Sequence, residues 1–517
     1  MTAADYIIEY LIARGVKRAY GYPGSLAGFI MDALRKRSDK IANRLLYTEQ
    51  ACGFAAIGDA LTSGEVVLCW ATSGPGASNL VTPIANAWLD SVPVIFLTAN
   101  VHTADSREKL NCAALRQNGN QELDIVSITR SITKFAARID DLGAVKTTLD
   151  RAFEAAISAR KGPVLIDLPI DISRGAVEPF SADFAASRKA EAKDKLQSIE
   201  KAILSAKNPL IVCGGGIRSA LVEESFLAWL ADIRGRKSAL KAVATLRGKD
   251  LLAADNPLNF GVIGVWGEER ANEAIKTADL IVAIGSRLAN RQLAAFGGAL
   301  ACEVIRVDID AAEFARGVTS AKTTDINADL SDLFAPAAAK APKRVIVSDV
   351  GQNMWRVGRE IGVKEGDRIL FSAGLGAMGF SLCAAIGAHY AAPDAEIIAF
   401  CGDGGLQMSI EELHFLAQRR VPIALIVLNN GALGLIRAFQ ERNFNGAYFS
   451  TTTETGYTAP DFEALAKAHG IDYHLFDGDL ERSGDKGLHA LIELASRLRK
   501  SSRLPFIIEA RVKPIYP

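Results

Sequence analysis

Apolar runs that end in small polar clusters recur along this chain of 517 residues. Residues 397–401 form one such run and end in residues 402–405 (GDGG), and residues 423–428 form another and end in residues 429–431 (NNG). Short apolar runs bounded by turn residues predict buried strands. Both clusters are therefore expected where a strand ends.

The segment between these two runs predicts a helix. Ser409 and Glu412 have the spacing of a capping box, and apolar residues follow at helical spacing. The order strand, helix, strand favours parallel strands, so both polar clusters should emerge at the same edge of a sheet. Ligands bind at that edge in α/β proteins.

One carboxylate, one carboxamide and several glycines would meet there. Asp403 and Asn430 offer hard oxygen ligands, and the glycines let backbone N–H groups approach an anion closely. A site with one protein charge suits Mg²⁺, which keeps waters and takes its other ligands from phosphate oxygens. We expect a diphosphate held through a metal ion.

The pair GDG and NN at this separation resembles the signature of thiamine diphosphate (ThDP) enzymes. The resemblance implies that Asp403, Asn430 and the backbone carbonyl of Ala432 hold Mg²⁺ on the diphosphate of the cofactor. Two unrelated turns are the plain alternative, because each motif is common by itself.

The alternation of apolar runs and helical patterns divides the chain into three parts, since its length exceeds what one core usually holds. We place a first domain at 1–172, a linker at 173–190, a central domain at 191–334, a linker at 335–344 and a third domain at 345–517. Each domain is predicted to be an α/β fold with a doubly wound parallel sheet. By the resemblance they are the pyrimidine-binding, central and diphosphate-binding domains.

Composition limits the function classes. The chain is 49% apolar and 23% charged with a net charge of zero, and it shows no basic face, so no nucleic-acid partner is expected. It has no apolar run long enough for a membrane span and no signal-peptide pattern, which predicts a cytoplasmic protein without a membrane partner. The seven cysteines lack metal-ligand spacing and predict buried thiols.

Glu49 stands where a short predicted strand meets an Ala- and Gly-rich helix. A carboxylate at a helix N-terminus can simply serve the helix dipole. The run EQACGFAAIGDAL, however, resembles the segment that carries the catalytic glutamate of ThDP enzymes. The resemblance implies that Glu49 hydrogen-bonds the aminopyrimidine of the cofactor and promotes loss of its C2 proton.

Further motifs resemble the acetolactate synthase branch of this family. Residues 72–79 (TSGPGASN) match its segment beside the pyrimidine, and residues 120–124 (NQELD) match its Phe-Gln-Glu motif, with Asn120 in place of Phe and Gln121 facing the reacting centre. By this resemblance the cofactor-binding set is Pro23, Gly24, Ser73, Gly76, Asn79, Gly351, Gln352, Gly376, Met378, Gly402, Gly404, Gly405 and Leu433. In that set, the Gly376 carbonyl would accept a hydrogen bond from the cofactor and Met378 would bend it.

Ser25, His102 and Phe439 are the expected substrate-pocket residues. His102 follows a predicted strand, although a single loop histidine is commonly a bystander. Phe439 stands where the branch has a Trp that shapes the acceptor pocket. No two histidines are adjacent, unlike in pyruvate-decarboxylase-type enzymes, and this disfavours simple release of an aldehyde.

Other functions remain open. Residues 374–379 (GLGAMG) also fit the dinucleotide fingerprint and follow an apolar run at 368–371, which would indicate an NAD-dependent oxidoreductase. A C–C hydrolase, a decarboxylase or a flavin oxidase of the ThDP family is a third alternative. Some relatives hold FAD in the central domain; Arg287 matches their motif, but residues 288–291 read LANR where the branch has FDDR, which argues against FAD.

The resemblance covers almost the whole chain and implies an enzyme that uses ThDP and Mg²⁺. Such an enzyme, a lyase or transferase, decarboxylates a 2-oxo acid, here pyruvate, and joins the two-carbon unit to a second carbonyl compound. It implies a homodimer or homotetramer, in which the Glu49 domain of one subunit meets the diphosphate domain of another. Because Asn120 and Phe439 depart from the branch, a sugar or another specialised ketone or aldehyde is an open candidate for the acceptor.

Overall fold

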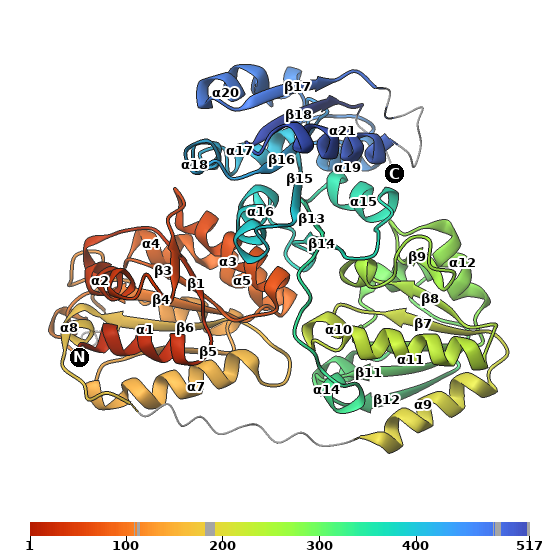
Figure 1. Ribbon diagram of the computed structural model, residues 1–517, viewed down its shortest axis with the longest axis horizontal. Coiled ribbons are helices and arrows are strands. Elements are labelled where there is room, and N and C mark those ends of the chain that lie inside the picture. The colour runs from red at the N-terminus through yellow and green to blue at the C-terminus, as the bar shows by residue number, and fades with distance from the viewer. Residues whose placement is uncertain (108, 111–113, 181–191, 479, 481–486, 514–517) are drawn as a thin grey trace. The chain divides into compact units, whose positions relative to one another are not determined.

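The computed structural model describes residues 1–517 except 108, 111–113, 181–191, 479, 481–486 and 514–517 (Figure 1). The described residues form three parallel six-stranded sheets flanked by helices, which confirms the predicted fold class. The chain divides into two compact units. One contains the first sheet together with Gly374–Pro393 and Met408–Val421, and the other contains the second and third sheets.

The first sheet has the strand order β2-β1-β3-β4-β6-β5. Its strands are β1 (Arg18–Gly21), β2 (Ala42–Arg44), β3 (Val67–Ala71), β4 (Val94–Asn100), β5 (Phe135–Arg138) and β6 (Val164–Pro169). Its helices are α1 (Ala3–Ala13), α2 (Gly28–Lys36), α3 (Glu49–Ser63), α4 (Pro75–Asn79), α5 (Val81–Asp90), α6 (Ile125–Thr129), α7 (Val145–Ile157) and α8 (Ile170–Arg174). Helices α1, α2 and α7 share one apolar core with the sheet, and α3 contacts β1 and β3. The inner strands are apolar on both faces because helices cover both.

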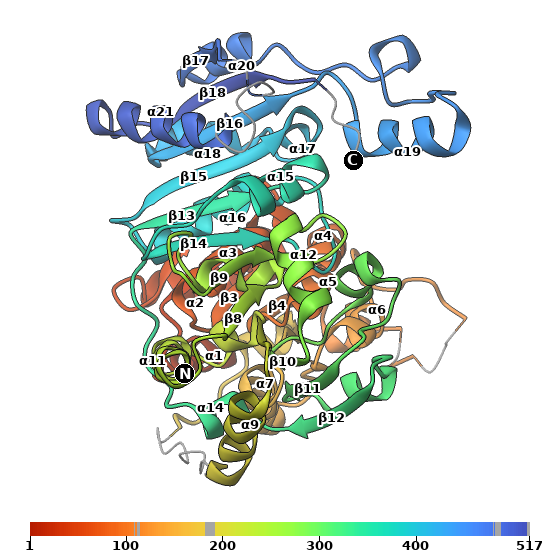
Figure 2. The ribbon, with the colours of Figure 1, turned by 90° about the vertical axis from the view of Figure 1, so that its right-hand side faces the viewer.

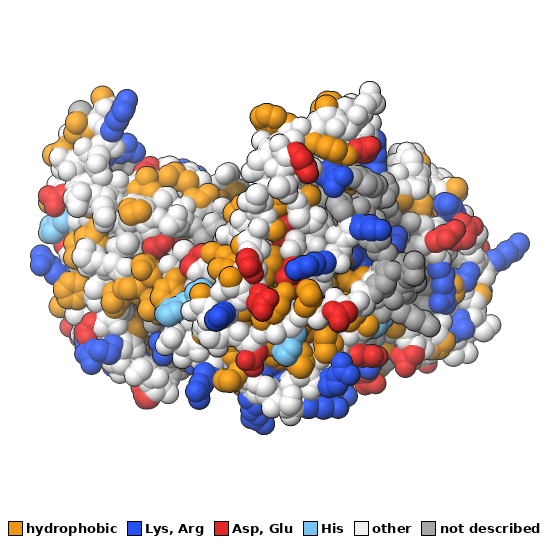
Figure 3. All heavy atoms as spheres, turned by 90° about the horizontal axis from the view of Figure 1, so that it is seen from above, with side chains coloured by type: hydrophobic (Ala, Val, Ile, Leu, Met, Phe, Trp, Pro, Cys, Tyr) orange, Lys and Arg blue, Asp and Glu red, His pale blue; other side chains and the backbone are white. Residues whose placement is uncertain are grey.

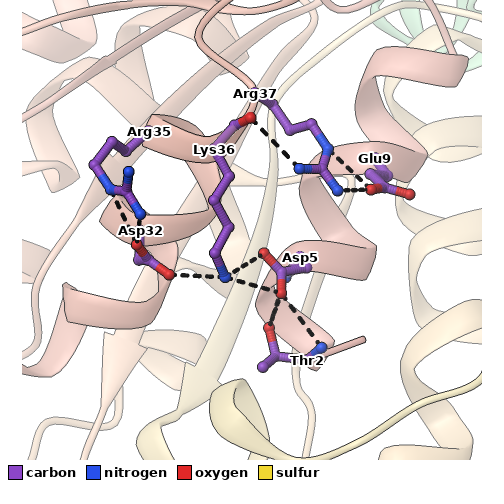
Figure 4. Close-up of polar contacts among 7 residues, drawn as sticks. All are labelled: Thr2, Asp5, Glu9, Asp32, Arg35, Lys36 and Arg37. Carbon is purple, nitrogen blue, oxygen red and sulfur yellow. Dashed lines mark hydrogen bonds and ion pairs between the residues drawn. The ribbon is translucent and has the colours of Figure 1, made fainter.

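A cluster of ion pairs joins α1 to α2. Figure 4 shows its members, Thr2, Asp5, Glu9, Asp32, Arg35, Lys36 and Arg37. The Lys36 ammonium lies 3.2 Å from Asp5 and 2.8 Å from Asp32. Because these groups are partly exposed, each pair adds little stability, and the cluster mainly fixes how the two helices pair.

Two further helices complete the first unit, α16 (Phe380–Ala391) and α18 (Glu412–Arg419). Helix α16 crosses α3 at very short range. A Cβ added at Gly58 would lie 2.1 Å from the carbonyl oxygen of Ala384, and one added at Gly387 would lie 1.8 Å from that of Ala55. The two backbones can touch because neither glycine carries a side chain.

The second sheet has the order β12-β11-β10-β7-β8-β9. Its strands are β7 (Pro209–Cys213), β8 (Lys241–Ala244), β9 (Asn259–Val262), β10 (Leu280–Ile284), β11 (Glu303–Asp308) and β12 (Lys322–Asn327). Its helices are α9 (Lys193–Ser205), α10 (Gly216–Ser219), α11 (Glu223–Arg236), α12 (Glu269–Thr277), α13 (Asn290–Leu293) and α14 (Leu330–Leu333). Counted from its own first strand, this is the order of dinucleotide-binding folds.

The third sheet has the order β14-β13-β15-β16-β18-β17, which can be followed strand by strand in Figure 2. Its strands are β13 (Arg344–Ser348), β14 (Asp367–Phe371), β15 (Glu396–Gly402), β16 (Ile423–Asn429), β17 (Asp472–Phe476) and β18 (Phe506–Arg511). The second unit also holds α15 (Gln352–Glu360), α17 (Asp403–Gln407), α19 (Gly434–Phe444), α20 (Phe462–His469) and α21 (Gly487–Ser501). Counted in the same way, the first and third sheets have identical strand orders.

The predicted capping box is wrong. Helix α18 begins at Glu412, and among the described residues the Ser409 hydroxyl has no hydrogen-bond partner. The Glu412 carboxyl group instead accepts a hydrogen bond from the backbone N–H of Tyr47. A long-range contact has therefore replaced the local one.

Other expectations have mixed outcomes. The six cysteines in the described part of the chain are free and buried, while Cys112 lies outside it. The predicted domain boundaries stay predictions, and most of the first linker, 181–190, is outside the described residues. No described helix combines the length and apolar character that crossing a bilayer requires.

Candidate active site

The carboxyl ends of β15 and β16 bring Asp403 and Asn430 together. The two strands pair in parallel, with Gly402 opposite Leu428, so the residues that follow them emerge side by side. Asp403 is the first residue of α17 and is only 2% exposed. Burial raises the pKa of its carboxyl group, and the backbone N–H of Asn430 acts in the opposite direction. The carboxylate of Asp403 therefore faces the turn that carries Asn430.

Tyr457 holds the Asp403 side chain from a distant loop. Its hydroxyl group donates a hydrogen bond of 2.7 Å to Oδ2 of Asp403, and Gln407 donates to the tyrosine oxygen at 3.3 Å. The sequence analysis missed Tyr457, because no motif surrounds it and it lies far from Asp403 in the chain. Its hydrogen bond fixes the orientation of the Asp403 carboxyl group.

Gln352 and Ala432 orient the Asn430 carboxamide. Its amide nitrogen donates to Oε1 of Gln352 at 3.2 Å, and its oxygen accepts from the backbone N–H of Ala432 at 3.0 Å. Gln352 opens α15 directly after Gly351, whose φ of 74° favours glycine. Leu433 is tied to the same turn through its N–H, which donates to the carbonyl oxygen of Thr451.

This donor set fits Mg²⁺ bound to a diphosphate. Within the described ranges no three His, Cys, Asp or Glu side chains converge on one point, and Asp403 is the carboxylate that directly follows β15. A hard cation held by one carboxylate, one carboxamide and a carbonyl needs further oxygens from an anionic ligand. Gly404 and Gly405 follow Asp403 directly, and a Cβ added at Gly405 would lie 2.7 Å from Oδ2 of Asp349, so the backbone N–H groups of this turn, and not a side-chain space, are what it offers an anion.

Glu49 occupies a second site, at the carboxyl edge of the first sheet. It is the first residue of α3, behind the N-cap Thr48, and is 8% exposed. The Asn79 amide donates to Oε2 of Glu49 at 3.0 Å, and a Cβ added at Gly76 would come within 3.0 Å of Oε1. The TSGPGASN segment therefore supplies both the partner and the space for this carboxylate.

A buried network fixes Gln121 beside the same segment. The Ser73 hydroxyl donates to the backbone oxygen of Gln121 at 2.6 Å, and the Asn100 amide donates to Leu123 and to buried Asp167 at 3.1 and 2.7 Å. Gln121 has φ of 65°, an uncommon backbone conformation for a residue other than glycine. Backbone strain of this kind concentrates at functional sites. Asn100 was not among the predicted site residues.

Comparisons with known proteins show the family to which this chain belongs. Family models match residues 1–128, 196–334 and 349–509 as the N-terminal TPP binding domain, central domain and C-terminal TPP binding domain of thiamine pyrophosphate enzymes. The chain is 31% identical to the acetolactate synthase isozyme 2 large subunit of Escherichia coli, over 91% of this chain and 90% of that protein. The chain belongs to the thiamine diphosphate enzyme family.

Two more relatives place it within the acetolactate synthase branch. A probable acetolactate synthase large subunit of Methanocaldococcus jannaschii is 31% identical over 91% of this chain and 87% of its own length. The acetolactate synthase large subunit of Lactococcus lactis is 30% identical over 92% of this chain and 88% of its own length. The predicted family is confirmed, and with it ThDP as the cofactor and decarboxylation with carboligation as the class of reaction.

The remaining predicted residues of this ThDP enzyme are placed as follows. Pro23, Gly24 and Ser25 follow β1, and a Cβ added at Gly24 would lie 2.4 Å from Cβ of Thr72 after neighbouring β3. His102 accepts a hydrogen bond at Nδ1 from the backbone N–H of Ala104, so the proton of a neutral ring lies on Nε2. These residues share the sheet edge with Glu49.

In the described part of the chain, Met378 and Phe439 form no hydrogen bond with Glu49 or Asp403. Met378, in the first unit, is half-buried. Phe439, on α19 in the second unit, is 56% exposed and packs edge-on against Phe444. On the face drawn in Figure 3, exposed apolar side chains are interspersed with acidic and basic ones.

The NAD-dependent alternative is not favoured. Residues 374–379 follow β14, an edge strand, whereas the dinucleotide fingerprint follows the inner first strand of its sheet. The backbone N–H of Gly374 is also already bound, to Oδ1 of Asp90 at 3.0 Å. In this ThDP enzyme the glycines belong to the turn before α16.

The central sheet has the strand order of dinucleotide-binding folds, but the turns that follow β7 and β10 pack directly against each other. The N–H groups of Gly214 and Gly216 donate to the carbonyl oxygens of Ile284 and Gly285 at 2.9 and 3.0 Å. A Cβ added at Gly214 would lie 2.0 Å from the Gly285 oxygen. These glycines serve close backbone packing, so the triple-glycine turn is no evidence for a nucleotide.

Proposed function

We propose that this enzyme decarboxylates pyruvate and transfers the two-carbon unit to a second carbonyl compound, with Mg²⁺ as its metal ion. The relatives named acetolactate synthase support pyruvate as the donor. The observation that carries the proposal is the buried carboxylate of Asp403 beside the carboxamide of Asn430 at two adjacent strand ends.

The residues at the edge of the third sheet would bind the charged end of the cofactor. Asp403, Asn430 and the carbonyl oxygen of Ala432 would hold Mg²⁺, and the backbone around Gly404 and Gly405 would receive the diphosphate. When bound, ThDP supplies the nucleophilic carbon and the electron sink for decarboxylation and carbon–carbon bond formation. Tyr457 would keep the Asp403 carboxylate in one orientation.

The residues at the edge of the first sheet would act on the uncharged ring of the cofactor. Glu49 would form a hydrogen bond to the aminopyrimidine and share a proton with it, and Asn79 would hold the carboxylate in place. Gln121 would face the substrate from a backbone fixed by Ser73 and Asn100. Glu49 itself is buried, which strengthens its hydrogen bond with Asn79.

Two subunits would share each active site, as the family resemblance implies, in a homodimer or homotetramer. A mixture of inactive Glu49→Gln and inactive Asp403→Ala subunits tests this arrangement. If exchange is random, half the dimers pair one intact Glu49 with one intact Asp403, and activity should return to about a quarter of wild type. No recovery after verified subunit exchange would contradict a shared site.

The acceptor and a flavin are tested together. The pure protein, supplied with ThDP, Mg²⁺ and pyruvate, should form acetolactate or an acetyl adduct of an added sugar, ketone or aldehyde. Formation of acetolactate or of an adduct with the added compound supports carboligation, whereas carbon dioxide release without any adduct contradicts it. An absorption band of bound flavin would favour the oxidase alternative.

A further inference from the structure

The Glu412 side chain enters the turn that precedes Glu49. Its Oε1 accepts a hydrogen bond of 2.8 Å from the backbone N–H of Tyr47, and the residue is 0% exposed. Both residues belong to the first unit. A buried carboxyl group has thus been diverted from capping its own helix to binding a backbone amide two residues before Glu49.

The surroundings of Glu412 favour its neutral form. Burial raises the pKa of this carboxyl group to about 8, with Glu411 also raising it and the N–H groups of Tyr47 and Thr48 lowering it. On the α3 side it faces the Cys52 thiol, whose pKa burial raises and on which Glu49 also acts. In the described residues Oε2 has no hydrogen-bond partner, and a neutral carboxyl group tolerates that better than a carboxylate does.

The turn that Glu412 holds sets the start of α3. The Thr48 hydroxyl caps the helix by accepting from the N–H of Ala51 at 3.1 Å, and Glu49 is the next residue. The rings of Tyr47 and His414 also lie together, with centroids 5.3 Å apart. Helix α18 therefore contacts Tyr47 twice, while α16 packs against the following turns of α3.

We propose that Glu412 is a positioning residue for Glu49, because its neutral carboxyl group fixes the Tyr47 amide and thereby the direction in which α3 presents the Glu49 carboxylate. This inference rests on the proposed role of Glu49. Removing the acceptor leaves the partly buried Tyr47 N–H without its partner, and the turn relaxes to find another one. A small displacement of a proton-transfer group lowers turnover steeply.

Two substitutions of Glu412 distinguish its role as a hydrogen-bond acceptor from the effect of its charge. Glu412→Ala removes the acceptor and should lower kcat by about 10- to 100-fold, with KM for pyruvate changed by less than about threefold. Glu412→Gln keeps a neutral oxygen at the same length and should retain kcat within about threefold. Glu411→Ala, a change at the neighbouring half-buried position, is the matched control and should retain wild-type kcat.

Hydrogen exchange in the protein without cofactor supplies a readout independent of turnover. Glu412→Ala should increase exchange in the peptide that contains Tyr47 and the first turn of α3 by about tenfold or more, whereas Glu412→Gln should not. Equal exchange in all three proteins would overturn the proposal. It would also be overturned if Glu412→Ala kept full activity or Glu412→Gln lost as much activity as Glu412→Ala.

The pH profile decides the question even if Glu412→Ala does not fold. Wild-type kcat should fall as pH rises through about 8, where Glu412 ionises beside Glu49, and Glu412→Gln should lack that decline. The same decline in both proteins would overturn the proposal. Full activity of Glu49→Gln would instead refute the proposed function, whatever Glu412 does.

Discussion

The first and third sheets have the same strand order but carry different chemistry at their carboxyl edges. In the third sheet, Asp403 follows the third strand and Asn430 follows the fourth. At the same two places the first sheet has the TSGPG turn and Asn100, without a carboxylate. Topology therefore fixes where polar groups gather, and the residues of the turns decide what they bind.

The carboxylate of the first sheet stands elsewhere, on the helix that follows the second strand. That helix is α3, and the helix in the equivalent place after the third sheet's second strand is α16. These two equivalent helices pack against each other through Gly58 and Gly387. Glu49 begins one of them, so its position depends on helix packing, whereas the position of Asp403 depends on strand pairing.

The largest expected effect compares the two carboxylates. Glu49→Gln should lower kcat by about a thousandfold or more, because it removes a proton-transfer group, yet leave binding of Mg²⁺ and ThDP within a few-fold. Asp403→Ala should abolish binding of the metal and, with it, of the diphosphate. Calorimetric titration of each variant with ThDP and Mg²⁺ measures both, with turnover assayed in parallel.

Equal loss of cofactor binding in both variants would break the comparison, since it would mean that the two carboxylates do the same task. Unaltered turnover of Glu49→Gln would remove Glu49 from the mechanism. Circular dichroism spectra matching the wild type are the control that both variants are folded.

A smaller effect tests the hydrogen bond that supports the Asp403 carboxylate. Tyr457→Phe deletes the hydroxyl that donates to Asp403 at 2.7 Å and should weaken Mg²⁺ or Mn²⁺ binding by about 10- to 100-fold. Tyr10→Phe deletes a similar hydroxyl, which donates to Asp150 at 2.7 Å away from both sites, and serves as the control. Equal metal affinity in Tyr457→Phe and wild type would show that Asp403 needs no such support.

Strand and motif placement were predictable from the sequence because their causes are local. Apolar runs ending in GDGG and NNG became β15 and β16; β15 is one residue longer at each end than predicted, and β16 is one residue longer at its C-terminal end. Burial on both faces and turn residues at the strand ends are written in neighbouring positions. The same holds for the position of Glu49 at the start of α3.

Contacts between distant segments were not predictable. Ser409 and Glu412 have the spacing of a capping box, yet the buried carboxyl group of Glu412 binds the distant backbone amide of Tyr47 instead. Tyr457 and Asn100 act through hydrogen bonds to residues far away in the chain, and no spacing announces them. Residues 214–216 show the opposite limit, because a glycine-rich turn after a strand serves close packing as well as phosphate binding.

A third prediction tests the contact between α3 and α16. Gly387→Ala should destabilise the protein by about 1–3 kcal/mol, because the new Cβ would lie 1.8 Å from a backbone oxygen that cannot move alone. Gly235→Ala is the matched control: it lies within α11 with no atom near the new Cβ, and should raise stability by up to about 1 kcal/mol. Chemical denaturation measures both, and equal effects would show that the helix crossing is loose.

The smallest expected effect concerns the pH dependence of stability. The pKa of Glu412 is raised from an ordinary value of 4.5 to about 8 in the folded protein. Its contribution to stability is therefore complete below pH 4.5 and is lost as pH rises towards 8, because the unfolded chain releases the proton first. Glu412→Gln cannot ionise, so the free energy of unfolding of the wild type should fall by about 1 kcal/mol relative to this variant between pH 6 and pH 7.

Thermal unfolding of the two proteins across that interval, with Glu411→Gln as the control, measures the difference. A constant difference would mean that Glu412 is ionised in the folded state, and the Tyr47 amide would then be held by a charge rather than by a neutral acceptor.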